Sequence, residues 1–288
     1  MEFKHIPCHE SLRPFIRNYW MLSSWCTATG TQQVFSNGAA SLQFYLSQDI
    51  RIDDGDRRYR TVLYHQNMQM VGVVTDEGTF NTFGVEFVPF CLRMFFPNEM
   101  TGNYASPEDL YDEEFITLSK NIYEAESTEK RVALLDNFFL KRLAEFPEGD
   151  INIERLNDVF DDIVPTDGST AHPHDFSPAD LASTACLSQK QFTRVFNKYV
   201  GMNPKSYLRL LRFHKALMEI QSSSDNSSLT NIAWGCGYYD LAHMTSDFRD
   251  ICGFSPSELN RHGEELTEAF GLKFSGLMKK KIKIDNLI

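Results

Sequence analysis

The sequence predicts an α+β protein in which a β-rich N-terminal sandwich or barrel is followed by a helical connector and an all-α C-terminal domain. Three observations favour this class. Short apolar or alternating runs separated by turn residues occupy residues 1–97, a helical period begins at Ser106, and a pattern of paired short helices occurs twice between Ser177 and Gly253. We therefore expect a β-rich domain (1–105), a connector (106–164), a linker (165–176), a helical domain (177–265) and a tail (266–288).

The first domain is predicted to contain strands over residues 41–46, 60–64, 68–74 and 79–88, which alternate or are continuously apolar. Turn signals such as Asn37-Gly38 separate them. This spacing is typical of a small antiparallel sandwich or barrel. Such a domain is able to enclose a small molecule, but aromatic residues spaced as in this region are more typical of a plain core.

The connector and the linker differ in composition. We expect a short helix starting at Pro107, a long helix over residues 128–146 and another short helix over residues 151–164. The apolar stripe of 128–146 suits either a homodimer surface or packing against the chain's own sheet, and both interpretations stay open. Residues 165–176 are rich in Pro, Asp, Gly, Ser and Thr, which predicts a hinge that lets the two domains reorient.

The helical domain begins with a helix-turn-helix pattern. Ser177-Pro178 starts a short helix, Ser188 caps a second helix over residues 189–200, and Gly201 ends it. Apolar residues of the second helix recur at helical spacing, which leaves an opposite face of long polar side chains able to enter a DNA groove. A solvated amphipathic helix is the simpler interpretation of this helix taken alone. The polar face consists of Lys190, Thr193, Arg194, Asn197 and Lys198.

The same plan occurs again over residues 229–253, which favours a pair of DNA-binding units over the simpler interpretation. A glycine turn precedes the cap Asp240, and the following helix presents a second polar face. Residues 204–221 form an amphipathic helix of roughly 27 Å between the units. That length suits two helices that contact DNA about one turn, roughly 34 Å, apart.

The segment that contains both units resembles the DNA-binding domain of the AraC/XylS family of bacterial transcription regulators. The resemblance lies in LSQKQFTRVFNKYVGMNPKSYLRLLRFHKAL and in IAWGCGYYDLAHMTSDFRDICGFSP, which ends in Gly253-Phe254-Ser255-Pro256. It implies double-stranded DNA and RNA polymerase as partners, and activation more often than repression. Segments 13–20 and 84–90 also resemble a sensor half found in some members, which implies a small-molecule effector or a dimerisation role. The candidate DNA-binding residues are Ser188, Lys190, Gln191, Thr193, Arg194, Asn197 and Lys198, and Ala242, His243, Thr245, Ser246 and Arg249.

Charge predicts an asymmetry between the two units. Residues 177–215 hold seven Lys/Arg and one acid, a balance of 7 − 1 = +6, whereas residues 216–262 hold two Lys/Arg and six acids, 2 − 6 = −4. The phosphate contacts that dominate affinity must then come mainly from the first unit. Ser246 also stands where an arginine is common in the family, so we expect weaker base readout by the second unit.

Composition excludes several other classes. The net charge of −11 argues against a protein that coats nucleic acid nonspecifically. Six scattered cysteines without C-x-x-C spacing, no signal peptide and no long apolar run predict a reduced, cytoplasmic protein. No hydrolase, phosphate-loop or zinc-protease motif is present, and His172-Pro173-His174 lies in the linker, so we expect no catalytic residue, cofactor or metal.

We therefore interpret the chain as a cytoplasmic, sequence-specific transcription regulator with a double helix-turn-helix domain. The alternative is a protein-interaction module that kept the fold and uses its acidic second unit to bind another protein.

Overall fold

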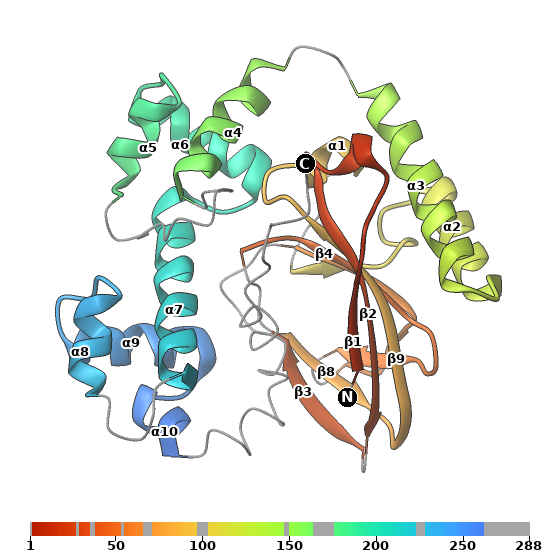
Figure 1. Cartoon of the computed structure of the whole chain (residues 1–288), viewed down its shortest axis with the longest axis horizontal. Coiled ribbons are helices and arrows are strands. Elements are labelled where there is room, and N and C mark those ends of the chain that lie inside the picture. Colours follow the sequence, from red (N-terminus) through yellow and green to blue (C-terminus); the bar gives the residue numbers. More distant parts are fainter. Residues whose placement is uncertain are drawn as a thin grey trace.

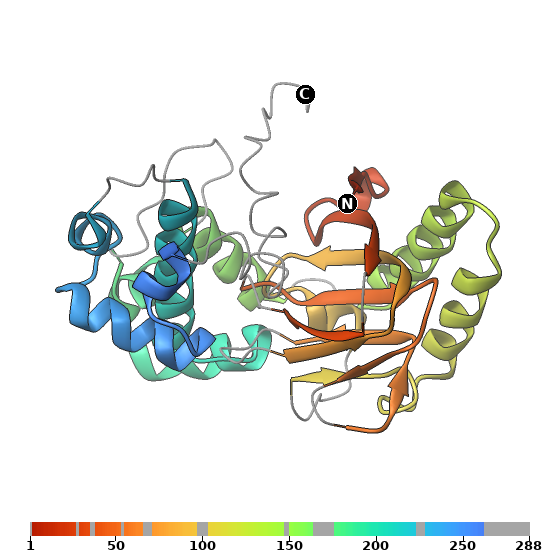
Figure 2. The ribbon, with the colours of Figure 1, turned by 90° about the horizontal axis from the view of Figure 1, so that it is seen from below.

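The computed structural model describes residues 2–26, 29–34, 38–52, 55–65, 71–96, 103–146, 150–163, 176–222 and 228–261. It confirms the α+β class: a β-rich N-terminal domain carries two helices on one side, and the helical C-terminal part lies on the other (Figures 1 and 2). Both linker histidines, and almost all of the expected linker, lie outside the described residues. The strands are β1 (Glu2–Ile6), β2 (Ile16–Cys26), β3 (Gly30–Val34), β4 (Ser41–Tyr45), β5 (Ile50–Ile52), β6 (Arg58–Tyr59), β7 (Thr61–Tyr64), β8 (Val71–Thr75), β9 (Gly78–Phe87) and β10 (Tyr104–Ala105).

The strands form two antiparallel sheets, of order β1-β2-β9-β4-β7-β10 and β3-β8-β5-β6. The long pair β2 and β9 holds the larger sheet together, with Tyr19 opposite Val85 and Cys26 opposite Gly78. β4 pairs with β9 on one side and β7 on the other, so it lies fully inside the sheet. The strands expected at 41–46, 60–64, 68–74 and 79–88 are therefore confirmed where the structure describes them.

The helices are α1 (Leu92–Phe95), α2 (Glu113–Glu124), α3 (Thr128–Glu145), α4 (Ile151–Ile163), α5 (Pro178–Thr184), α6 (Gln189–Val200), α7 (Pro204–Ser222), α8 (Leu229–Gly235), α9 (Leu241–Cys252) and α10 (Pro256–Arg261), with a 3₁₀ turn η1 at Glu10–Leu12. The short helix expected from Pro107 is wrong, because residues 107–111 form a turn. Tyr111, at φ 51, leaves the helical region there, and Asp109 bonds back to the Ser106 backbone N–H.

An ion-pair cluster joins α2 to α3. The Arg142 guanidinium binds the Asp112 carboxylate at 2.7 Å and the Glu114 carboxylate at 3.0 Å, and Lys141 also bonds to Glu114. The hydrogen bond from Lys141, with the neighbouring charge of Arg142, lowers the pKa of the Glu114 carboxyl. The paired acid is therefore stabilised in its charged form in the folded protein.

The apolar face of α3 packs on its own domain. Phe139 is fully buried and lies edge-to-face with Phe87 of β9 at 5.6 Å and with Phe95 of α1 at 4.9 Å between ring centroids. Of the two interpretations of this stripe, packing against the chain's own sheet accounts for the buried residues. The homodimer stays a prediction.

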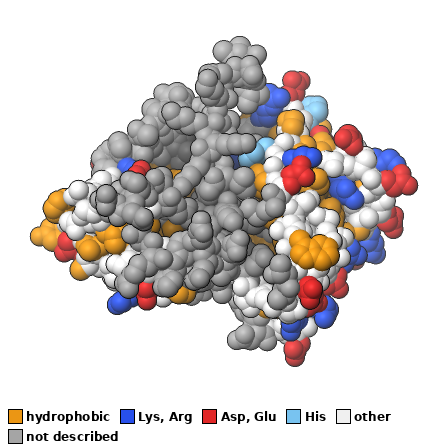
Figure 3. Space-filling model, turned by 60° about the horizontal axis from the view of Figure 1, so that its bottom comes forward, with side chains coloured by type: hydrophobic (Ala, Val, Ile, Leu, Met, Phe, Trp, Pro, Cys, Tyr) orange, Lys and Arg blue, Asp and Glu red, His pale blue; other side chains and the backbone are white. Residues whose placement is uncertain are grey.

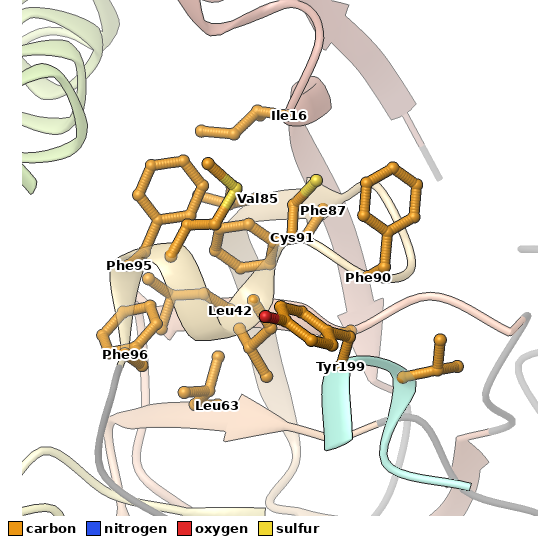
Figure 4. Packing of buried hydrophobic residues seen from close by; sticks show 14 of the residues in the cluster. Ile16, Leu42, Leu63, Val85, Phe87, Phe90, Cys91, Phe95, Phe96 and Tyr199 are labelled. Carbon is orange, nitrogen blue, oxygen red and sulfur yellow. The ribbon is translucent and has the colours of Figure 1, made fainter. Parts of the chain in front are cut away.

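The core of the β-domain continues into the first helix-turn-helix unit. Phe160 of α4 contacts Phe90 of the β-domain at 5.1 Å, Phe196 of α6 at 5.9 Å and Tyr207 of α7 at 5.4 Å. In the close-up, Tyr199 of α6 lies in the same cluster as side chains of the sheet (Figure 4). Any reorientation at the expected hinge, residues 165–176, would have to break this shared core.

Gly201 is a site of close approach between the two parts. It ends α6 in a left-handed conformation, with φ 83. A Cβ placed there would lie 1.7 Å from the Cε1 atom of His65, so only glycine fits between the imidazole and the helix end. This contact holds the end of α6 directly against the residue that follows β7.

The second unit has a core of its own. Leu210, Phe213 and Leu217 of α7 pack with Met244 and Phe248 of α9 in a cluster separate from that of the β-domain. α7 therefore contributes its beginning to one core and its later turns to the other, and it connects the two units (Figure 1).

Candidate nucleic-acid interface

Local sequence fixes both ends of α6. The Ser188 hydroxyl oxygen accepts a hydrogen bond from the Gln191 backbone N–H, and the Gln191 side-chain oxygen accepts one from the Ser188 backbone N–H, which together form a capping box. Gly201 supplies the left-handed residue at the other end. α6 is thus a rigid helix of 12 residues.

Burial divides α6 into two faces as the periodicity predicts. Phe192, Phe196 and Tyr199 are buried against the rest of the protein. Lys190, Arg194, Asn197 and Lys198 are exposed on the other side, and Thr193 is half-buried. Long cationic and amide side chains on an exposed helix face are the groups that reach phosphates and base edges in a major groove.

The exposed cations of this face are available to a ligand. Lys190 and Arg194 make no ion pair with any residue that the structure describes. Two other candidates already have structural partners: Ser188 and Gln191 form the capping box. The Thr193 hydroxyl donates to the Gln189 carbonyl at 2.9 Å, which leaves its methyl group and its acceptor lone pairs for contacts outside the helix.

α9 is built in the same way. Asp240 accepts a hydrogen bond from the His243 backbone N–H at 2.7 Å, and Gly253, at φ 77, ends the helix. Ala242, Ser246 and Arg249 are exposed. They line a shallow hollow of ≈ 650 Å³ together with Leu241, Thr245 and Asp250.

Two candidates on α9 are partly engaged by the protein. The His243 ring is half-buried, lies edge-to-face on Tyr238 at 5.3 Å, and accepts a long 3.5 Å hydrogen bond from the Tyr239 backbone N–H. The Thr245 hydroxyl donates to the Leu241 carbonyl at 2.7 Å. The polar surface of α9 is therefore poorer in free donors than that of α6.

Sequence reasoning missed an ion-pair cluster between α7 and α9. Arg209, one of the seven cations counted in the first unit, binds the Asp247 carboxylate at 2.7 Å and the Asp250 carboxylate at 2.6 Å. Its charge is used inside the protein, and the free positive charge of the first unit is correspondingly smaller. The signal was an acid, Asp247, at a buried position of an amphipathic helix.

Two aromatic side chains of the second unit are exposed. Trp234, near the end of α8, is 61% exposed, and Tyr239, just before the cap of α9, is 86% exposed.

On the face shown in Figure 3, cations and acids are interspersed over the β-domain, so this part of the surface presents neighbouring charges of both signs.

The described cysteines are unpaired, and five of the six are buried. Burial raises the pKa of the Cys236 and Cys252 thiols to about 11 each, which keeps them protonated. Among the described residues, no group of three or more His, Cys, Asp or Glu side chains lies close enough to hold a metal ion. Within those same residues no helix is both long and apolar enough to span a membrane.

Comparison with known proteins gives two family matches. A helix-turn-helix domain family matches residues 181–262, and a domain family of unknown function (DUF6597) matches residues 4–102. The transcriptional activator RhaS of Escherichia fergusonii is 35% identical over 81 residues, which are 28% of each chain. A putative AraC-like transcription regulator of Streptomyces lividans is 30% identical over 84 residues, 29% of this chain and 27% of that protein.

The similarity to these relatives is confined to one part of each protein, since the chain spans little more than a quarter of their length. Among solved structures, ToxT of Vibrio cholerae covers 84% of this chain and 98% of its own, with 13% identity and a TM-score of 0.45. The matched segment contains both polar helices, α6 and α9, and the helix between them. Residues 181–262 therefore form a helix-turn-helix domain of the AraC type.

Proposed function

We propose that this protein is a sequence-specific transcription regulator that binds double-stranded DNA mainly through α6. The observation that supports the proposal best is the exposed face formed by Lys190, Arg194, Asn197 and Lys198, opposite a fully packed aromatic face. Because the aromatic side is fixed in the core, the cationic side enters a groove without rearrangement of the helix.

The roles of the individual residues follow from their exposure. Lys190, Arg194 and Asn197 contact base edges, and Lys198 with Lys205 contacts phosphates. Arg249 supplies the main cationic contact of α9, with Ala242 and Ser246 beside it, and His243 and Thr245 at the margin. Ser188 and Gln191 hold the start of α6, whose N-terminal backbone N–H groups face a phosphate.

The proposal extends to regulation. The β-domain, residues 1–105, binds a small-molecule effector or a second copy of the chain, and the shared core around Phe160 transmits the effect to α6. The name of the RhaS relatives supports activation, which places RNA polymerase among the partners. The protein acts in the cytoplasm and requires no cofactor.

Selection from random DNA, followed by affinity measurements at several salt concentrations, tests the proposal. Four exposed cations lie on α6 and at the start of α7. If Lys198 and Lys205 each neutralise one phosphate, the slope of log K against log salt is about −1.8, so affinity falls about tenfold between 50 and 200 mM salt. If Lys190 and Arg194 also neutralise one phosphate each, the slope is about −3.6 and the loss is about 100-fold. Failure to enrich any sequence, at low or at high salt, would contradict the proposal.

A second candidate function is a protein-interaction module, and the exposed Trp234 and Tyr239 favour it. Exposed aromatic side chains are frequent anchors of protein interfaces. They lie on the acidic second unit, where DNA phosphates are attracted least. Three results together would establish this function instead. The wild-type chain would bind a protein partner, Trp234→Ala would lose that partner, and the wild-type chain would enrich no DNA.

A further inference from the structure

Arg209 connects the two helices that hold the second unit together. It lies in the second turn of α7, and its guanidinium donates from Nε to Asp247 Oδ1 at 2.7 Å and from Nη2 to Asp250 Oδ2 at 2.6 Å. The two acids are three residues apart on α9, so they lie on neighbouring turns of one side of the helix. One planar, rigid side chain thus holds two points of α9. We refer to Arg209, Asp247 and Asp250 as the α7–α9 clamp.

An apolar contact lies beside the clamp. Phe213, one turn after Arg209, and Phe248, next to Asp247, are both fully buried, with ring centroids 4.7 Å apart. Apolar contacts are not directional, so this pair holds α9 against α7 but leaves its rotation weakly determined. The two hydrogen bonds of the guanidinium add the directional constraint.

The surroundings of the clamp show that it is not a loose surface pair. The Asp247 side chain is 6% exposed and that of Arg209 30%, whereas that of Asp250 is 59% exposed. A buried carboxylate is costly unless a cation compensates it, and Arg209 is the cation placed to do so. Asp250 borders the hollow that Ser246 and Arg249 line, so its charge lies next to the proposed DNA surface.

We propose that Arg209 is a positioning residue that fixes the orientation of α9 relative to α7, and thereby the spacing of the two DNA segments that α6 and α9 contact. α6 is held by the β-domain core, so the position of α9 relative to α6 depends on α7, on the apolar contacts between α7 and α9, and on the clamp. This inference rests on the proposed function. Arg209 also has an electrostatic effect on DNA binding, because it neutralises two carboxylates that would otherwise repel the phosphates beside α9.

The DNA test uses the selected fragment and the same fragment with one base pair inserted between the two protected segments. An inserted pair moves one segment by about 3.4 Å and rotates it by about 35°, so we expect the wild type to bind it about tenfold more weakly. Arg209→Met keeps the stem and removes the clamp, and its ratio between the two fragments should fall to about threefold or less. Arg209→Lys bonds one carboxylate at a time and should lie between the two.

Lys205→Met is the matched control. It removes an exposed cation one turn earlier on α7 and lies outside the clamp. It should weaken binding to both fragments by the same factor and keep the wild-type ratio. If Arg209→Met also keeps that ratio, Arg209 is only one more positive charge, and the inference is overturned.

A second measurement needs no DNA. Spin labels at the exposed positions of Asn197 and Ser246, in a chain with the exposed Cys186 changed to serine, report the distance between α6 and α9. We expect one narrow distance distribution for the wild type and for Lys205→Met, and a broader one for Arg209→Met. Asp250→Asn removes one arm of the clamp at an exposed position and should also broaden it, and it decides the question if Arg209→Met does not fold.

The two experiments separate the inference from the function on which it rests. Distributions as narrow as the wild type in both Arg209→Met and Asp250→Asn would overturn the clamp. If the wild type enriches no DNA, the proposed function fails, while the distances still show whether Arg209 positions α9.

Discussion

Phe160 is the residue at which the β-domain and the first DNA-binding unit share one core, so its truncation should destabilise both. Its ring contacts Phe90, Phe196 and Tyr207, which come from three different segments of the chain. Phe160→Ala removes these contacts and leaves a cavity that rigid neighbours on three sides cannot close. The expected cost is about 3–5 kcal/mol of unfolding free energy.

The measurement is urea unfolding followed by the fluorescence of Trp20, which is buried in the β-domain far along the sequence from position 160. The other two tryptophans, Trp25 of β2 and Trp234 of the second unit, are exposed and are changed to phenylalanine in the parent chain, which leaves the signal to Trp20. With an m-value of about 3 kcal/mol per M, the loss moves the Trp20 midpoint down by roughly 1–2 M urea.

Phe213→Ala is the matched control, because it deletes a buried ring from the separate core of the second unit. It should leave the Trp20 midpoint nearly unchanged. The reasoning is refuted if Phe160→Ala spares the Trp20 transition, or if both variants shift it equally.

Two further predictions concern stability. Gly201→Ala should lower the melting temperature more than Gly253→Ala. Both glycines have positive φ, but only a Cβ at position 201 would meet another side chain, that of His65. Equal losses in melting temperature would mean that the contact with the β-domain is not formed. Glu114→Gln should reduce stability at pH 7, and its effect should become smaller as pH falls below the usual pKa of a glutamate. The bonded Lys141 lowers the folded-state pKa of that carboxyl, so its stabilisation is present above the unfolded pKa and is lost as pH falls through the folded pKa. Denaturant titrations of both proteins across pH 3–7 check this, and a difference between them that does not shrink as pH falls would contradict it.

The sequence was informative wherever a local rule determines the backbone. Both helix-turn-helix units were predicted from features that act within one or two turns of helix. These are the serine caps, the terminal glycines Gly201 and Gly253, and the 3.6-residue period of apolar side chains. The strands of the β-domain followed from alternation and turn residues in the same way. At 107–111 the local rule failed, because the proline start is followed by a residue with positive φ.

Contacts between distant segments could not be predicted. Nothing near Phe160 in the sequence indicates that its ring meets Phe90 and Phe196, and an apolar residue on a helix is compatible with many partners. The clamp was missed for the same reason: Arg209 and Asp247 are 38 residues apart, and the charge count treated both as free. A count of charged residues overestimates the free charge of a surface when some of those residues form ion pairs within the protein.

The exposed face of α6 is the proposed main DNA-binding surface of the protein. The direct measurement is the affinity of Arg194→Ala and Ser246→Ala for the same selected DNA, with the salt slope of each. We expect Arg194→Ala to bind the DNA at least about tenfold more weakly than the wild type. Its slope of log K against log salt should be smaller in magnitude by about 0.9 if the Arg194 guanidinium also neutralises a phosphate. Ser246→Ala should change the affinity by less than about threefold. Equal losses for the two variants, or full affinity without Arg194, would contradict the assignment of α6 as the principal DNA-binding helix.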